Sequence, residues 1–270
     1  MDHISKIRNK RPVVHCITNY VTANDVANAV LAIGASPMMA DDPFETAEIV
    51  RIADALVINT GTISETRFEA MMKAGKAANA MGKPVVLDPA GVSASLVRRK
   101  RALVLLSEIK FSCIRGNASE IKALTLGNSH SRGVDAAYDD LFDKNDIEKA
   151  AKIAADFSRK TGAVTVISGA VDTVSDPDET FAVYNGSAMM GKITGSGCML
   201  SALIAAFISA NGEGCSTVSA ALSAFGICGQ IAEKRMGEHD GNASFRNYLI
   251  DAVYGISDDV LSGNAIIKKI

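Results

Sequence analysis

Short apolar runs rich in Val and Ile alternate along this chain with longer segments of helical periodicity. Several of the runs are continuously apolar, as are strands that helices cover on both faces. This alternation is typical of βα units and predicts an α/β fold with a mainly parallel sheet, whose strand order the sequence leaves open. The six predicted strands are 12–18 (PVVHCIT), 36–40 (SPMMA), 55–61 (ALVINTG), 84–89 (PVVLDP), 111–116 (FSCIRG) and 163–169 (AVTVISG).

Two parts of the chain depart from the βα pattern. Residues 171–193 contain the turn-rich sequences SDPDET and YNGS, which predict an antiparallel hairpin at the edge of the sheet. After it, the sequence predicts three consecutive helices, which begin at GSGCMLSALIAAFISA and continue over 217–236 and 245–262. The most polar segment, 127–146, predicts an excursion on the surface.

Length and charge limit the classes of protein that fit. With 270 residues, of which 48% are hydrophobic, we expect a single α/β domain over 1–270. Lys and Arg number 28 against 30 Asp and Glu, which gives no electrostatic reason to bind nucleic acid or an anionic membrane. The most apolar window, 199–210, is shorter than the about 20 residues that a spanning helix needs. The N-terminus does not resemble a secretory signal, so we expect no membrane partner and a cytoplasmic location.

Cysteine and histidine patterns argue against two kinds of site. The five cysteines are an odd number without a CxxC pair, which disfavours both a disulfide framework and a structural zinc site. The four histidines show no metal-ligand spacing. His15 lies within the first predicted strand, where a hydrogen-bonded structural histidine is favoured over a catalytic base.

Polar residues follow several predicted strands at the point where each strand ends, the edge at which open α/β sheets bind ligands. VVLDPAG places Asp88 and Pro89 after one strand, and VISGAVD places Ser168 after another. CIRGNASEI places Arg115, Asn117 and Glu120 after a third. Two carboxylates, Asp88 and Glu120, are oxygen ligands suited to a hydrated Mg²⁺. The alternative for Glu120 is a structural cap in the first turn of a helix.

The sequence ITGSGCMLSALIAAF is the sharpest local signal. Gly195 and Gly197 precede a long helix rich in small residues, and free amides at a helix N-terminus suit a phosphoryl group. Cys198 falls in the first turn, where the helix dipole is expected to favour its thiolate. The alternative is a glycine-rich helix entry that only allows close packing between helix and sheet.

Two familiar phosphate motifs do not fit. GSAMMGKI nearly matches the P-loop, but Ile193 stands where the Mg²⁺-binding hydroxyl is required, and the segment is predicted to be a hairpin turn. The dinucleotide fingerprint needs a third glycine at position 200, which is Leu200. A Rossmann oxidoreductase is therefore disfavoured.

Taken together, the motifs resemble the hydroxyethylthiazole kinase family of the ribokinase-like superfamily. The resemblance covers almost the whole chain, apart from the segment after Gly127 and the extreme C-terminus. It rests on HCITNYVTANDVANAVLAIGASPMMA, ALVINTGTI, VVLDPAG, IRGNASEI, VISGAVD and ITGSGCMLSALIAAF in this order. It implies a three-layer αβα sandwich with a mainly parallel sheet and an antiparallel edge hairpin. It also implies ATP-dependent phosphorylation of the hydroxyl of 4-methyl-5-(2-hydroxyethyl)thiazole, for thiamine salvage, by a homotrimer with sites at subunit interfaces.

The resemblance also assigns roles to residues of this chain. It implies contacts to the thiazole alcohol from Met39 and Gly195, with Asn19 and Pro89 near the same pocket. It implies ATP contacts from Arg115 and Ser168, the latter where Thr is usual, with Asn117 in the same Asn-x-x-Glu element. Asp88 and Glu120 match the acidic positions associated with Mg²⁺ and phosphate.

Cys198 stands where most ribokinase-like enzymes carry a catalytic aspartate. In phosphoryl transfer, positioning and charge neutralisation supply most of the acceleration. We therefore expect Cys198 to orient the substrate hydroxyl or accept weakly from it, while the 194–197 amides stabilise the phosphoryl group.

Three rival functions remain open at this level. One is a kinase of another small alcohol, such as a hydroxymethylpyrimidine or a sugar. Another is a hydrolase or acyl transferase with Cys198 as nucleophile and His15 or His239 as base. A ligand-binding protein that has lost the transfer activity is the third, although the glycine cradle, Asp88 and Glu120 are intact.

Overall fold

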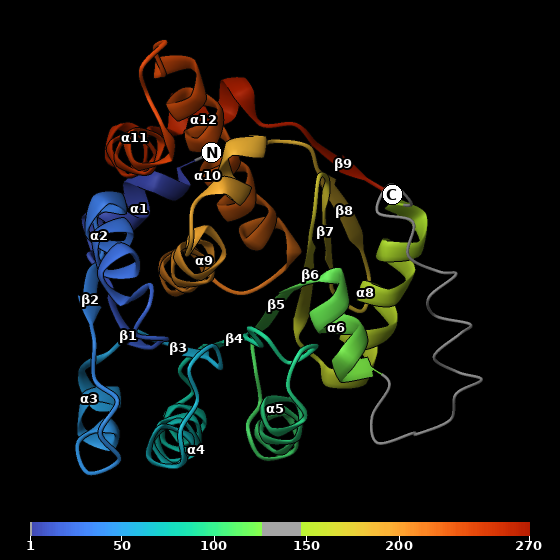
Figure 1. Ribbon diagram of the computed structural model, residues 1–270. Helices are drawn as coiled ribbons and strands as arrows, with labels where there is room; N and C mark the ends of the chain where they lie inside the picture. Colours follow the sequence, from blue (N-terminus) through green and yellow to red (C-terminus); the bar gives the residue numbers. More distant parts are fainter. Residues whose placement is uncertain (1, 126–146) are drawn as a thin grey trace.

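A computed structural model describes residues 2–125 and 147–270 of the chain, and within them the backbone forms one twisted sheet (Figure 1). The strands lie in the order β2-β1-β3-β4-β5-β6-β7-β8-β9. The first six are parallel, and all six coincide with the strands predicted from apolar runs. They are β1 (Val13–Ile17), β2 (Ser36–Met38), β3 (Ala55–Asn59), β4 (Val85–Asp88), β5 (Cys113–Asn117) and β6 (Val164–Ser168).

The edge beyond β6 is antiparallel. The strands there are β7 (Asp172–Ser175), β8 (Thr180–Val183) and β9 (Ile267–Lys269), each paired antiparallel with the strand before it in the sheet. The turn between β7 and β8 is the predicted SDPDET sequence, in which Asp176 Oδ1 accepts from the amides of Asp178 and Glu179, both at 3.0 Å. The predicted edge hairpin is confirmed over these two strands.

Helices cover both faces of the sheet, as Figure 1 shows, and the predicted three-layer αβα sandwich is confirmed. One layer contains α1 (His3–Lys10), α2 (Ala23–Ile33), α9 (Ser196–Asn211), α10 (Cys215–Arg235), α11 (Asn242–Gly255) and α12 (Asp258–Asn264). The other contains α3 (Thr46–Ile52), α4 (Glu65–Ala80), α5 (Leu96–Glu108), α6 (Ala118–Thr125) and α8 (Ile147–Thr161).

The continuous apolar character of the strands has a direct structural cause. Side chains alternate between the two faces of a strand, so a strand covered on both faces is apolar at every position. In β3, Val57 packs under the α9 layer, whereas Leu56 and Ile58 pack under the α4 layer. All five residues of β3 are buried.

Two predictions of local structure were wrong. YNGS does not turn a hairpin, because β8 pairs with β9 and the chain then forms a short 3₁₀ helix, η1 (Ala188–Lys192), capped by the Ser187 hydroxyl. GSAMMGKI is therefore not a hairpin turn. The helix predicted over 245–262 is two helices, because Ile256 is extended and Ser257 caps α12 by accepting from the amide of Val260 at 3.2 Å. The segment 127–146 lies outside the described residues.

Helix α10 is the one helix among the described residues that is long and apolar enough to cross a membrane by composition. Its most apolar window is 83% buried inside the protein, which is the environment of a core helix. The predicted most apolar window, 199–210, falls in α9, whose residues from Met199 to Ile208 are also buried.

Candidate active site

The parallel strands end along one edge of the sheet, and the polar residues singled out in the sequence are arranged along it. Following the strand order, this edge carries Met39, Asn19, Asp88 and Ser168 at or just after the ends of their strands, and Arg115 two residues before the end of β5. Asn59, which was not singled out in the sequence, ends β3 on the same edge. Helix α9 packs across β3 and β4, and its first turns contact the ends of these strands through the Cys198–Asn59 and Ser201–Asp88 hydrogen bonds. Strand ends and helix start therefore form one polar region.

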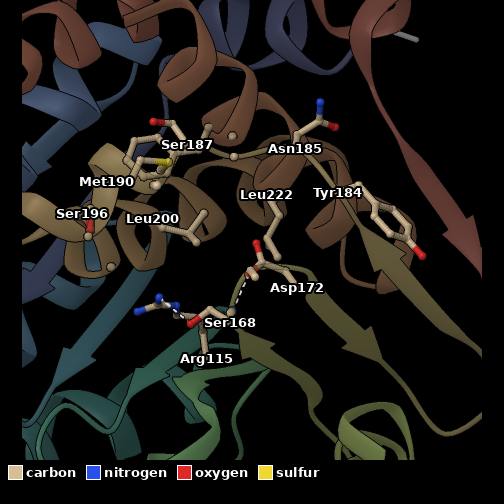
Figure 2. A pocket seen from close by; sticks show the side chains of 18 residues that line it. Arg115, Ser168, Asp172, Tyr184, Asn185, Ser187, Met190, Ser196, Leu200 and Leu222 are labelled. Atoms are coloured by element: carbon tan, nitrogen blue, oxygen red, sulfur yellow. Dashed lines mark hydrogen bonds between the residues drawn. The ribbon is translucent and has the colours of Figure 1, made fainter. Parts of the chain in front are cut away.

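A cleft of about 490 Å³ opens at the ends of β5 and β6. Figure 2 shows Arg115 and Ser168 on one wall, Ser187 and Met190 on the opposite wall, and Leu200 between them. The first wall comes from strand ends and the second from η1 and the segment before it. The cleft thus has charged and hydroxyl groups at one side and an apolar floor, a combination suited to a nucleotide.

Arg115 is the cation of the cleft. Its Nη2 donates to Ser168 Oγ at 2.7 Å (Figure 2). The guanidinium also lies against Gly197, where an added Cβ would stand 2.3 Å from Arg115 Nη1. The absence of a side chain at Gly197 therefore gives the guanidinium room beside the start of α9.

The start of α9 has the geometry of an anion cradle. Gly195 is the N-cap residue and adopts φ +88°, a left-handed conformation that glycine tolerates best. A Cβ there would also approach Thr22 Cγ2 to 2.8 Å. The first intrahelical bond runs from Met199 N to Gly195 O at 2.8 Å, so the amides of 196–198 precede the helical ladder. Ser196 and Gly197 line the cleft.

Cys198 is the partly exposed cysteine of the five, and the other four are buried. Its Sγ accepts from Asn19 Nδ2 at 3.2 Å and from Asn59 Nδ2 at 3.3 Å. Burial raises the pKa of the Cys198 thiol, the negative charge of Asp88 raises it further, and hydrogen bonds from Thr22 and Asn19 only partly oppose these effects. The expectation of a favoured thiolate was therefore wrong.

Asp88 is buried at the end of β4. Its Oδ2 accepts from Ser201 Oγ at 2.9 Å, one turn into α9. Burial raises the pKa of Asp88 to about 6, opposed by the charge of Arg115 and reinforced by that of Glu120. The two carboxylates are thus close enough to interact electrostatically.

Glu120 and Asn117 form a reciprocal cap at the start of α6. Asn117 Oδ1 accepts from the amide of Glu120 at 3.0 Å, and Glu120 Oε2 accepts from the amide of Asn117 at 2.9 Å. Glu120 Oε1 accepts from the amide of Gly91 at 2.9 Å. The capping role considered for Glu120 is confirmed, and its second oxygen links α6 to the loop after Asp88. Asn117 does not line the cleft.

Of the residues assigned to the alcohol, Met39, Asn19 and Pro89 do not line this cleft, whereas Gly195 directly precedes Ser196, which does. Met39 is 40% exposed in the loop after β2, and Pro89 is buried directly after Asp88. His15 is buried with Nε2 2.7 Å from Ala40 O, so the structural role expected for it is confirmed. Burial lowers the pKa of His15. Among the described residues, no three His, Cys, Asp or Glu side chains are clustered to hold a metal.

Sequence reasoning missed three residues. Asn59 ends β3 in the quoted ALVINTG, and the rule that selects polar residues at strand ends applies to it equally. Asp172 lines the cleft and its Oδ1 accepts from the amide of Gly169 at 2.9 Å, while burial raises its pKa to about 6. Ser201 gave no signal, because a serine within an Ala- and Ser-rich helix is ordinary.

Comparisons with known proteins agree on the family. The model of the hydroxyethylthiazole kinase family matches residues 4–259. A hydroxyethylthiazole kinase of Clostridium acetobutylicum is 48% identical over 265 residues, which are 98% of this chain and 97% of the relative. The solved structure of the hydroxyethylthiazole kinase protein of Pyrococcus horikoshii OT3 superimposes with a TM-score of 0.87 at 38% identity, covering 99% of this chain and 97% of that one.

More distant structures share the fold alone. A ribokinase-like superfamily protein of Enterococcus faecalis V583 superimposes with a TM-score of 0.61 at 12% identity, over 93% of this chain and 88% of that one. The fold is thus the ribokinase-like fold, as the resemblance implied. The family match over nearly the whole chain and the high identity of its relatives lead to one conclusion: this chain belongs to the hydroxyethylthiazole kinase family.

Proposed function

We propose that this chain is an ATP-dependent kinase that phosphorylates the hydroxyl of 4-methyl-5-(2-hydroxyethyl)thiazole in thiamine salvage. The observation that carries the proposal is the convergence of Arg115, Ser168 and the amides at the start of α9 on one cleft, in a member of this family. A cation, a hydroxyl and free amide dipoles are the groups that bind and stabilise a transferring phosphoryl group.

ATP would lie in the cleft with its phosphates toward Arg115 and the start of α9. The apolar residues Leu200 and Leu222 line the cleft and offer a surface against which the adenine ring of ATP can pack. Ser168 keeps a hydroxyl within reach of the same site, and its bond to Arg115 holds the guanidinium in place. Asn117 supports this wall indirectly, by capping the helix that follows β5.

The alcohol would approach from the side of Met39 and Asn19. Asn19 reaches Cys198 across the gap between β1 and α9, at 3.2 Å, and Thr22 packs against Gly195. A hydroxyl placed beside the Cys198 thiol would face a phosphoryl group held by the amides of 196–198. Pro89 would close the same pocket from the loop after β4.

Cys198 would orient this hydroxyl rather than remove its proton as a strong base. A thiol whose pKa is raised stays protonated at neutral pH, so it offers little thiolate to accept a proton. The same property argues against a Cys198-dependent hydrolase. Of the two bases considered for that reaction, His15 is held by the carbonyl of Ala40, and His239 is exposed in the loop between α10 and α11.

Asp88 and Glu120 fit a hydrated Mg²⁺. Both are carboxylates, the ligand type that Mg²⁺ prefers. The negative charge of Glu120 is one cause of the raised pKa of Asp88. A bound cation would relieve the repulsion between the two carboxylates. Mg²⁺ bound there would supply charge neutralisation for the phosphates. Because Glu120 already accepts two backbone amides, water would complete most of the coordination.

We also propose that the chain is one kinase domain that works as a homotrimer in the cytoplasm. One continuous sheet passes through all described strands. Large apolar side chains are exposed near Met39, including Tyr20 at 74%, Val21 at 60% and Phe44 at 89%. A neighbouring subunit covering them would also enclose the alcohol site.

The test is ATP consumption with Mg²⁺ across a panel of thiazole, pyrimidine and sugar alcohols. The proposal predicts ADP formation that depends on the thiazole alcohol and greatly exceeds that with the other acceptors. Turnover of a sugar or a hydroxymethylpyrimidine without turnover of the thiazole would reassign the substrate. Sedimentation equilibrium of the same preparation tests the trimer.

A further inference from the structure

Asn59 occupies a buried position at the centre of the polar edge. It ends β3 directly opposite Asp88 in the parallel ladder and is 1% exposed. It does not line the cleft. A buried carboxamide must have its donors and acceptor satisfied, so its partners define how it is oriented.

The orientation of this carboxamide is fixed by a backbone donor. Asn59 Oδ1 accepts from the amide of Gly61 at 2.9 Å, and an amide nitrogen can only donate. Gly61 also fits closely, because an added Cβ would stand 2.9 Å from the same oxygen. The Nδ2 group of Asn59 must therefore face the other way, toward Cys198 Sγ at 3.3 Å and toward the Asp88 carboxylate, with which the side chain also forms a hydrogen bond.

A second carboxamide is fixed in the same manner. Asn19 Oδ1 accepts from the amide of Thr22 at 3.1 Å, which turns Asn19 Nδ2 toward Cys198 Sγ and Asn59 Oδ1, both at 3.2 Å. Two N–H donors thus point at one sulfur. Since sulfur is a weak acceptor with few sites, the thiol proton is left to point away from both asparagines.

We propose that Asn59 is a positioning residue for the transfer step, which orients the Cys198 thiol by donating to its sulfur from a carboxamide locked by Gly61. The proposal rests on the proposed function for the role of Cys198. Asn59 also forms a hydrogen bond with the Asp88 carboxylate, but it acts on the reacting hydroxyl through this thiol. Removing it should change kcat and leave the KM values of ATP and the alcohol nearly unchanged.

The test variant is Asn59→Ser. A serine hydroxyl can still accept from the amide two residues later and so preserve the local turn, but it is too short to reach Cys198. Asn79→Ser is the matched control, because Asn79 also joins two segments through its carboxamide, donating to Lys110 O at 2.8 Å and accepting from Lys110 N at 2.7 Å. Asn79 lies on the exposed end of α4.

Kinetics are measured as a double-mutant cycle with Cys198→Ala. We expect Asn59→Ser to lower kcat about threefold to tenfold, the size of one lost hydrogen bond, with both KM values within about twofold. In the Cys198→Ala background the same change should lower kcat clearly less, because only the hydrogen bond to Asp88 is then lost. Equal losses in the two backgrounds, or the same loss in Asn79→Ser, would overturn the proposal.

Infrared spectroscopy tests the contact without turnover. The S–H stretching band of Cys198 is isolated by subtracting the spectrum of Cys198→Ala, and it should shift and broaden in Asn59→Ser but not in Asn79→Ser. An unchanged band overturns the proposal, as does an Asn59→Ser protein that does not fold, which would make Asn59 a scaffold residue. If the wild type failed to phosphorylate the thiazole alcohol, the proposed function would fail while this band still tested Asn59.

Discussion

Gly197→Ala should weaken the binding of ATP without lowering the stability of the fold. The added Cβ would stand 2.3 Å from Arg115 Nη1, whereas ordinary contact begins at 3.4 Å, so the guanidinium must retreat by about an ångström. The Arg115 Nη2 to Ser168 Oγ bond is 2.7 Å long and cannot absorb this displacement without weakening. Arg115 would then no longer face the phosphates from its present position.

The cost can be worked from the lost contacts. A hydrogen bond to a charged group contributes about 1.5–3 kcal/mol, which corresponds to roughly a 10- to 150-fold rise in the KM of ATP. The fold itself should not suffer. Alanine is favoured over glycine within a helix by about 0.5–1 kcal/mol, so the melting temperature should stay the same or rise.

Steady-state kinetics and thermal unfolding of the same preparations check both parts. Gly186→Ala is the control, because Gly186 lines the same cleft and no atom lies within 4 Å of its added Cβ. Its KM for ATP should stay near the wild-type value. A Gly197→Ala enzyme with an unchanged KM for ATP would refute the placement of the phosphates beside Arg115, and equal effects of the two variants would show a non-specific cause.

Three further predictions concern single side chains. Cys198→Ala should lower turnover by much less than about 10⁴-fold, and a loss of that size or more in the initial-rate assay would make Cys198 a general base. Asp88→Asn should inactivate the enzyme yet stabilise it at neutral pH. Because burial raises the Asp88 pKa from 3.8 to about 6, the folded state binds the proton more tightly than the unfolded state. Wild-type stability should therefore fall by at most about 3 kcal/mol as the pH rises from about 4 to about 6, and urea titrations of Asp88→Asn should lack this part of the slope. The same pH slope in both proteins would show that Asp88 is not its source. Ser257→Ala removes the α12 cap and should lower the free energy of unfolding by about 1 kcal/mol in urea, with activity retained; an unchanged free energy would mean that the cap contributes nothing.

The parallel strands could be predicted because most of their residues are apolar, which gives a clear pattern in the sequence. Strands β3 and β4 are buried at every position, so nearly every residue contributes to an apolar run, whereas the edge strand β2 is exposed or half-buried. The α/β class follows from the alternation of such runs with helical segments, whereas the edge hairpin follows from the turn-rich sequence SDPDET. The break at Ser257 could not be predicted, since one capping serine inside a continuous helical pattern is a weak signal. The pairing of β8 with β9 is a contact between segments about 80 residues apart, and no local pattern encodes it.

The site residues that lie at or near the ends of strands could be predicted from the sequence. Arg115 of β5 donates to Ser168, which ends the adjacent strand β6. The electrostatics of Cys198 could not be read from the sequence, because the expected helix dipole competes with burial and with Asp88, a residue 110 positions earlier. Asn59 ends a strand and could have been selected by the rule for strand ends, but its role could not be read from the sequence. Its importance lies in a partner on α9 that the sequence does not place beside β3.

The central claim is that the γ-phosphate of ATP passes to the thiazole alcohol in the cleft at the start of α9. The most direct measurement is mass spectrometry of the products formed with ATP that carries ¹⁸O on its γ-phosphate. The account predicts a thiazole phosphate ester that contains the labelled phosphoryl group. Label found only in inorganic phosphate, with no labelled ester, would contradict it.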